Sequence, residues 1–124
     1  MAGYSKKPLV DKLGLKAGMR AQFYGPVYRP PAGVLVTPPP WDFVHYFARK
    51  RSLLRKHFRM LSRHLAPAGL LWVSWPKRSS GEKTDLDENI VRKIGLQAGL
   101  VDVKVCAVDE VWSGLKFVIR LKNR

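Results

Sequence analysis

Six prolines between Gly25 and Pro40 restrict this chain more than any other feature of its sequence. The segment GPVYRPPAGVLVTPPP cannot be helical throughout, because proline lacks the backbone N–H donor and clashes with the preceding turn of a helix. Only Gly33–Thr37 is free of proline for long enough to be extended, which predicts a short edge strand there. The sequence does not define the conformation of the rest of the segment.

The clearest helix spans residues 48–65. Leu54, Phe58, Leu61 and Leu65 recur at helical spacing and form one apolar stripe, and the opposite side is almost purely cationic. The pattern predicts that this helix ends at Pro67 and Gly69, and that a buried strand at Leu70–Trp75 follows. The other expected elements are a helical turn from Lys7–Leu9 to Gly14, strands at Met19–Phe23, Trp41–Phe47, Val101–Ala107 and Leu115–Leu121, and a helix from Thr84 to Gly99.

The helix that ends at Gly99 has two overlapping capping boxes, Thr84 with Asp87 and Asp85 with Glu88. After it, apolar and polar residues alternate in two strands joined by a turn at 109–114. The expected apolar faces are Val101, Val103, Val105 and Ala107 on the first strand, and Leu115, Phe117, Ile119 and Leu121 on the second.

This order of elements predicts an α/β fold with a mostly parallel sheet and helices on both of its faces. The last strand, Leu115–Leu121, is expected to be antiparallel to the others and to lie between or beside them. No linker is long enough to divide the chain, so residues 1–124 are expected to form one domain.

The charge is strongly positive and unevenly distributed. The formal net charge is +14, of which residues 1–65, with 13 Lys/Arg against two acidic residues, contribute +11. A charge of this sign permits binding to nucleic acid or to an acidic protein, without requiring either. The single cysteine, Cys106, excludes an internal disulfide, and no apolar run approaches a membrane span. We therefore expect a cytoplasmic protein that makes no membrane contact.

Several stretches resemble known proteins. The order WDFVHYF, basic helix, LAPAGLLWVSW, capped helix, GLVDVKVCAV and LKFVIRL resembles the second half of the class I S-adenosylmethionine-dependent methyltransferase fold. The stretches YSKKPLVDKLGLKAGMR, LLWVSWPKRSSG and VDVKVCAVDEVWSGLKFV are similar to a small bacterial family described only as a domain of unknown function. The resemblance implies a truncated, methyltransferase-like Rossmann sheet and no established activity.

The proline-rich segment departs from that fold. A Rossmann-type cofactor site needs a strand, a glycine-rich turn and a helix, because the turn amides and the helix N-terminus hold the ligand. Here Tyr24-Gly25-Pro26 follows the first strand, no G-x-G-x-x-G is present, and no acidic residue is placed to bind a ribose hydroxyl. We therefore expect that the chain has lost S-adenosylmethionine binding and uses no cofactor.

A ligand crevice is expected where the loop after Trp75 and the turn after Val108 meet, at the carboxyl ends of neighbouring strands. A structural role is open for the same residues: Asp109 and Ser113 would tie the turn, Thr84 or Asp85 would cap its helix, and Trp112 would pack as a lid. The candidate crevice residues are Lys77, Ser79, Ser80, Thr84, Asp109, Trp112 and Ser113.

The cationic side of the 48–65 helix is a second candidate surface. It could follow a phosphate backbone without reading base sequence, although a charged helix face that only contacts solvent has the same pattern. Its residues are Arg49, Arg51, Arg55, Lys56, Arg59 and Arg63. The three histidines lack a cysteine or carboxylate to complete a metal site and are expected to pack at the edge of the core.

Three functions remain open from the sequence. The first is a non-catalytic, Rossmann-like binding or interaction module. The second is nonspecific nucleic-acid binding through the Arg49–Arg63 face. The third is a degenerate methyltransferase with Asp109 and Lys77 at its site, for which Asp109→Ala would abolish activity without unfolding the chain.

Overall fold

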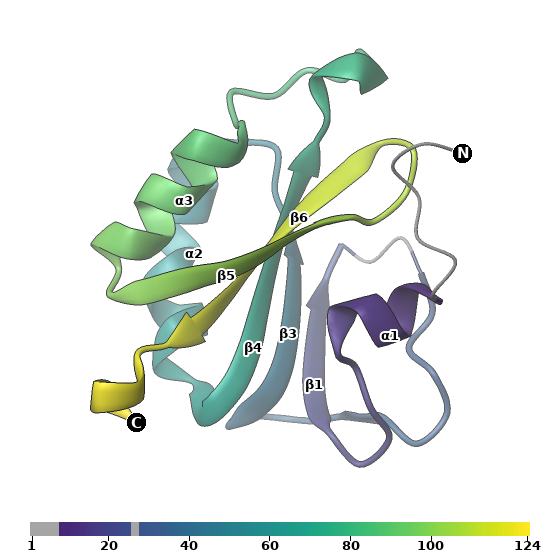
Figure 1. Ribbon diagram of the computed structural model, residues 1–124, viewed down its shortest axis with the longest axis vertical. Helices are drawn as coiled ribbons and strands as arrows, with labels where there is room; N and C mark the ends of the chain where they lie inside the picture. Colours follow the sequence, from purple (N-terminus) through teal and green to yellow (C-terminus); the bar gives the residue numbers. More distant parts are fainter. Residues whose placement is uncertain (1–7, 26–27) are drawn as a thin grey trace.

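A mixed β-sheet forms the centre of the molecule (Figure 1). The computed structural model describes residues 8–25 and 28–124, in which the sheet has six strands in the order β2-β1-β3-β4-β6-β5. Strands β2, β1, β3 and β4 are parallel, and β6 runs antiparallel between β4 and β5. The strands are β1 (Arg20–Tyr24), β2 (Leu35–Val36), β3 (Trp41–Phe47), β4 (Leu65–Pro76), β5 (Leu100–Ala107) and β6 (Trp112–Ile119); the helices are α1 (Leu9–Leu13), α2 (Arg51–Arg63) and α3 (Glu88–Gln97), with short 3₁₀ turns at Arg78–Ser80 and Leu121–Asn123.

Helices cover both faces of this sheet, and each face has its own core. Buried residues of α2 and α3, such as Phe58 and Ile94, pack with one set of strand residues. On the other face, Leu13 of α1 packs with Ala21, Phe43 and Trp72, and the Trp72 indole N–H donates to the Leu13 carbonyl at 2.8 Å. The expected α/β fold, mostly parallel with an antiparallel C-terminal strand, is confirmed.

The proline-rich segment contributes little regular secondary structure to the fold. Its described residues contribute only the two-residue strand β2, which lies at the edge of the sheet as expected and is exposed. None of its described residues, 25 and 28–40, is helical. Four residues, 37–40, lead directly from β2 into β3. This connection therefore places no helix on the α2 side of β1.

The 48–65 helix is shorter than its sequence pattern predicts. Helix α2 ends at Arg63, and β4 already begins at Leu65, so the predicted end at Pro67 and Gly69 is wrong. Proline disfavours the helical conformation of the residue before it, here Ala66. The chain is therefore extended from Leu65 onward and pairs with β3. Leu65 is buried as its apolar pattern predicts, but from a strand.

The C-terminal strands also differ from their predicted boundaries. Strand β6 spans Trp112–Ile119 rather than Leu115–Leu121, and Leu121 is 79% exposed. In β5 a register shift between Asp102 and Lys104 inserts Val103 as an extra residue. A bulge of this kind changes which face the following side chains point to, so the predicted single valine face is wrong.

Candidate functional site

The carboxyl ends of the parallel strands β1, β3 and β4 lie at one edge of the sheet, where open α/β sheets hold their ligands. Two regions of this edge contain the relevant side chains. We call the first, where Arg49, the 77–84 loop and the 109–113 turn meet beside β4 and β6, the closed edge. The second, between the ends of β1 and β3, is the switch-point pocket, lined by Tyr24, Gly25, Tyr46, Phe47, His57 and Met60.

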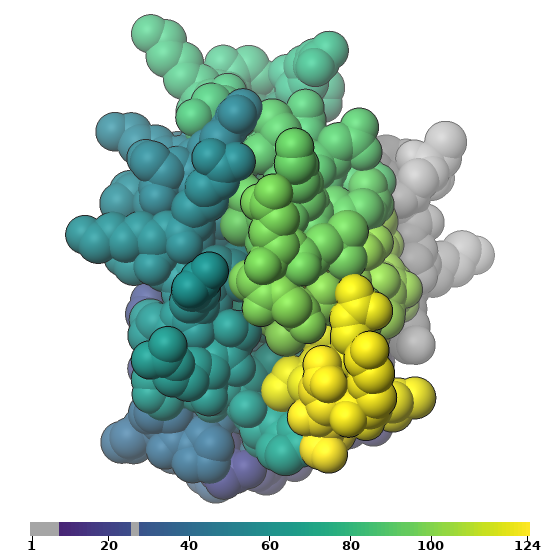
Figure 2. Space-filling model, turned by 90° about the vertical axis from the view of Figure 1, so that its left-hand side faces the viewer, coloured from purple at the N-terminus to yellow at the C-terminus, as the bar shows by residue number. Residues whose placement is uncertain are grey.

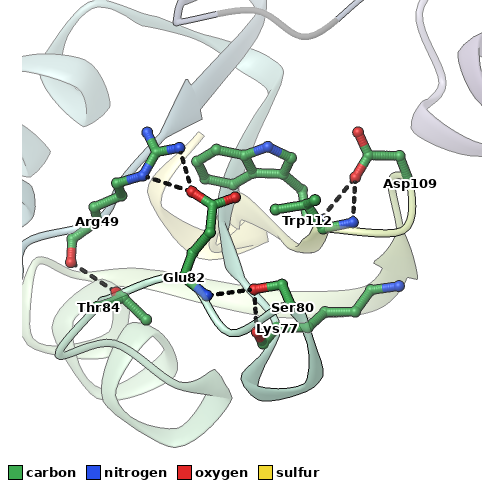
Figure 3. Close-up of polar contacts among 8 residues, drawn as sticks. Arg49, Lys77, Ser80, Glu82, Thr84, Asp109 and Trp112 are labelled. Atoms are coloured by element: carbon green, nitrogen blue, oxygen red, sulfur yellow. Dashed lines mark hydrogen bonds and ion pairs between the residues drawn. The ribbon is translucent and has the colours of Figure 1, made fainter.

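At the closed edge, Arg49 covers the indole of Trp112 (Figure 3). The guanidinium carbon lies 4.7 Å from the ring centroid, and an amino group of the same side chain pairs with Glu82 at 2.7 Å. Trp112 is only 5% exposed and also packs edge-on against Phe47, with ring centroids 5.1 Å apart. The indole therefore packs as a lid residue, as the structural alternative predicts.

Thr84 and Asp85 do not cap the helix that follows them. The N-cap of α3 is Asp87, whose carboxylate accepts from the Ile90 N–H at 2.8 Å. The Thr84 hydroxyl instead donates to the carbonyl of Arg49 at 2.6 Å, and Asp85 accepts from the backbone N–H of Arg51 at 2.7 Å. The predicted capping boxes are therefore wrong, because these two side chains bond to the backbone at the start of α2, 35 and 34 residues earlier in the chain.

Asp109 is engaged in its own turn. One carboxylate oxygen accepts from the backbone N–H groups of Val111 and Trp112, at 2.8 and 2.7 Å. The turn is joined to the neighbouring loop by the Lys77 N–H, which donates to the Val111 carbonyl at 2.7 Å. The two bonds to Asp109 and the one from Lys77 all hold the β5–β6 turn.

The remaining predicted crevice residues divide between local bonds and solvent. The Ser80 hydroxyl donates to the Lys77 carbonyl at 2.6 Å and accepts from the Glu82 N–H, whereas Ser79 is exposed. The Lys77 side chain extends away from Arg49 and Glu82 (Figure 3). Ser113 lies within β6, opposite Trp75. The structure thus brings these residues to one edge, and their role in ligand binding stays a prediction.

The cations predicted for the 48–65 helix separate into two groups, and Arg49 lies before α2, which begins at Arg51 and not at residue 48. Arg49 and Arg51 are engaged with Glu82 and with the Asp85 region, so they are not part of a freely available cationic surface. The other four predicted residues are exposed and make no ion pair with any described residue. They are Arg55, Lys56, Arg59 and Arg63. Figure 2 shows the α2 segment beside α3, with long side chains that project from it into solvent.

The strand order reverses between β1 and β3. From β1 the chain moves outward to β2 and then returns to the other side of β1, where it forms β3. A reversal of this kind opens a crevice at the carboxyl ends of the two central strands. The crevice predicted from the sequence lies beside β4 and β6, and the reversal of the strand order is the signal that points to the ends of β1 and β3.

On the α1 side of this reversal, Tyr28 fills the space. Its hydroxyl lies 2.8 Å from Nδ1 of His45, and the opposite nitrogen, Nε2, lies 2.6 Å from the hydroxyl of Ser74. His45 and Ser74 are completely buried, and Tyr28 also packs against Phe23 and Phe47. Both ring nitrogens of the histidine are therefore satisfied by neutral hydroxyl groups.

The electrostatics of this cluster follow from its burial. Removal from water lowers the pKa of His45 to about 3 and raises the pKa of Tyr28, so both are neutral near pH 7. His45 is thus a hydrogen-bonded core residue and not one at the edge of the core. Among the described residues, no group of His, Cys, Asp and Glu could hold a metal ion.

On the α2 side of the reversal lies the switch-point pocket, with a volume of about 270 Å³. The Tyr46 hydroxyl lies 2.7 Å from Nδ1 of His57, and the rings of Tyr24 and Tyr46 are 5.8 Å apart at 45°. Burial raises the pKa of Tyr46, so its phenol keeps its proton near neutral pH. The contact between Tyr46 and His57 has no signal in the sequence, because Tyr46 lies in strand β3 and His57 in helix α2.

Solved structures with a similar fold include S-adenosylmethionine-dependent methyltransferases. The magnesium protoporphyrin IX methyltransferase ChlM from Synechocystis PCC 6803, with bound SAH, has a TM-score of 0.52 and 12% identity over 68% of this chain. LepI in complex with SAH and a substrate analogue has a TM-score of 0.57 and 12% identity over 90% of the chain. A structure described as a pericyclic reaction enzyme reaches 0.54, again at 12% identity over 90%.

These similarities define the fold as that of the class I methyltransferases, and no more, because the sequences are so different. The chain spans 48% of the length of the ChlM structure and 39% of the LepI structure. No family model and no curated protein sequence matches the chain. In the part of the chain that the structure describes, no helix is both long enough and apolar enough to cross a membrane.

Proposed function

We propose that this domain is a non-catalytic binding module that has lost the S-adenosylmethionine site of its fold. The position of Tyr28 carries the proposal. In a Rossmann-type site a glycine-rich turn and a helix follow the first strand and hold the cofactor. Here a chain segment without a helix in its described residues follows β1, and its Tyr28 ring occupies the α1 side of the strand reversal.

The end of β2 supports the same conclusion. The residue type expected there for a ribose hydroxyl is acidic. In this chain β2 ends at Val36 and continues as Thr37 and three prolines, and Asp42 in the next strand is paired with Arg20 at 3.0 Å. The residues present therefore do not fit S-adenosylmethionine, and we derive no methyl-transfer step.

Isothermal titration with S-adenosylmethionine and with SAH tests the proposal. We expect no binding heat at millimolar ligand, whereas micromolar binding accompanied by methyl transfer would contradict it and favour a degenerate methyltransferase. In that case Asp109→Ala would abolish the activity without unfolding the domain. A Tyr28→Ala variant serves as a second arm, because gain of cofactor affinity in that variant alone would identify Tyr28 as the group that blocks the site.

A second candidate function is nonspecific nucleic-acid binding, which four exposed cations of α2 that pair with no described residue favour. Contacts from Arg55, Lys56, Arg59 and Arg63 to phosphates would release counterions, so the affinity for duplex DNA should fall steeply with salt. The double variant Arg55→Glu, Arg59→Glu should weaken binding, whereas Lys93→Glu with Lys104→Glu, a matched change on other elements, should do so much less. Equal losses in both double variants would indicate an effect of net charge alone.

A further inference from the structure

The α1 side of the sheet is covered over only part of its width. Helix α1 packs on β1, β3 and β4 through Leu13, and it meets β5 at one end, where the Ala107 carbonyl accepts from Lys12 at 3.2 Å. In Figure 1, β5 and β6 face the viewer and α1 lies to their side, over β1. The other end of β5 is therefore left open on this side of the sheet.

An apolar groove of about 560 Å³ lies at that open end, where β5 begins and β6 ends. Val101 and Val118 are cross-strand partners, so their side chains point to the same face, and Val103 is the extra residue of the β5 bulge. Val103 is 53% exposed, and Leu121, in the turn after β6, is also exposed. Aliphatic side chains thus gather in one hollow that another chain can fill.

The charge around the groove is positive. No acidic residue lines the groove among those described, and Asp102 of β5 is paired with Arg92 of α3 at 2.8 Å. The cations that line the groove, or lie beside it on paired positions of β5 and β6, make no ion pair with a described residue. They are Lys104, Lys116, Arg120, Lys122 and Arg124.

This combination selects one kind of partner. A second copy of the chain is disfavoured, because it would bring the same cations to the contact, and because a bulge and the exposed Lys104 are features that keep edge strands from pairing with each other. A nucleic acid would find no aromatic ring in the lining on which to stack its bases. A peptide with both aliphatic and acidic side chains complements the apolar lining and the positive charge.

We infer that this groove binds an acidic, aliphatic peptide segment of a partner protein. Its aliphatic side chains fill the space beside Val103 and Leu121, and its carboxylates pair with Arg120 and Lys122. Strand β5 ends the strand order and pairs with β6 alone among the described strands, so its outer backbone groups are available to an extended segment. The inference rests on the proposal that the domain is a binding module, and it names the class of partner.

Fluorescence anisotropy with three labelled peptides tests the inference. The first peptide alternates glutamate with valine, the second has serine in place of each valine, and the third has lysine in place of each glutamate. We expect the first to bind, the second to bind about tenfold more weakly or worse because it buries no aliphatic side chain, and the third not to bind. No binding of the first peptide, or equal affinity for the first two, would overturn the inference.

The apolar lining is tested by Val103→Ser combined with Leu121→Ser. Both side chains are exposed, so the fold should be retained, and the first peptide should bind about tenfold more weakly. NMR locates the peptide on the wild-type chain, where the amide signals of residues 101–103 and 118–122 should move. Shifts confined to other residues would place the peptide elsewhere and overturn the inference.

The cations are tested by Arg120→Glu combined with Lys122→Glu, which should nearly abolish binding of the first peptide. Arg55→Glu combined with Arg59→Glu makes the same change of charge on α2 and should have little effect. Equal losses would mean that net charge alone attracts the peptide, and binding to phosphatidylserine vesicles but to no peptide would indicate a lipid surface; either result overturns the inference. Binding of S-adenosylmethionine would contradict the lost cofactor site alone, whereas absent peptide binding contradicts only the groove.

Discussion

The two regions of the carboxyl edge differ in how their polar groups are used. At the closed edge, Arg49, Glu82, Thr84 and Asp109 bond to one another or to nearby backbone, and Trp112 is covered. At the switch-point pocket, the Tyr24 hydroxyl and Nε2 of His57 have no described partner. A set of polar residues at the right edge of a sheet is therefore not enough to define a site, because self-satisfied groups hold the fold together.

The filled side of the strand reversal gives the largest expected effect. Tyr28→Ala should lower the free energy of unfolding by about 3 kcal/mol, because it removes a packed ring and leaves Nδ1 of buried His45 without a partner. Tyr28→Phe keeps the ring and should cost about 1 kcal/mol. Denaturant unfolding measures both values. Equal losses would mean that the ring itself contributes nothing.

The pH dependence of stability tests the same cluster. The pKa of His45 in the folded chain, about 3, lies below the ordinary value of 6.5, so the unfolded chain binds a proton first as the pH falls. The stability that this residue contributes is complete above about pH 7.5 and should decrease by about 2.7 kcal/mol by pH 4.5.

A His45→Gln variant is the control for that slope. The pKa of Asp42 is lowered by its hydrogen bonds with Arg20, so the stability that Asp42 contributes is lost only below this pH range. Asp42 therefore does not affect the slope between pH 7 and pH 4.5. Unfolding curves collected between pH 7 and pH 4.5 should be flatter for the variant. An unchanged slope would show that other groups dominate.

Asp109 distinguishes a turn residue from a ligand residue at the closed edge. Asp109→Ala should destabilise the domain by about 1–2 kcal/mol, because two backbone N–H groups lose their acceptor. Asp109→Asn keeps an acceptor oxygen and should cost clearly less. Thermal unfolding compares the two. If neither variant is destabilised, the carboxylate is not needed for the turn, and its role as a ligand residue gains weight.

The smallest effect is expected for the Arg49–Glu82 pair. Both side chains are substantially exposed, at 53% and 36%, so a double-mutant cycle should give a coupling of only about 0.5 kcal/mol. Arg55→Ala, which removes an exposed cation without a described partner, should leave stability nearly unchanged. A coupling several times larger would mean that the contact with Trp112 stabilises the closed edge more than the exposure suggests.

Regular patterns in the sequence were sufficient to predict most of the fold. They do not reveal the contacts between elements that lie far apart in the chain. Strand β3 has the predicted boundaries, because its dense aromatic and β-branched residues allow no alternative. The predicted end of α2 was wrong, because the pairing of Leu65 with Trp41 of β3 outweighs the apolar stripe that continues past Arg63. The same limit applies to the site: Tyr46 and His57 meet only once the helix packs on the sheet.

Isothermal titration of the wild-type domain with S-adenosylmethionine tests most directly whether the cofactor site of this fold has been lost. We expect no binding heat at millimolar ligand, because Tyr28 occupies the α1 side of the strand reversal and no acidic residue follows β2. Micromolar binding would contradict the proposal.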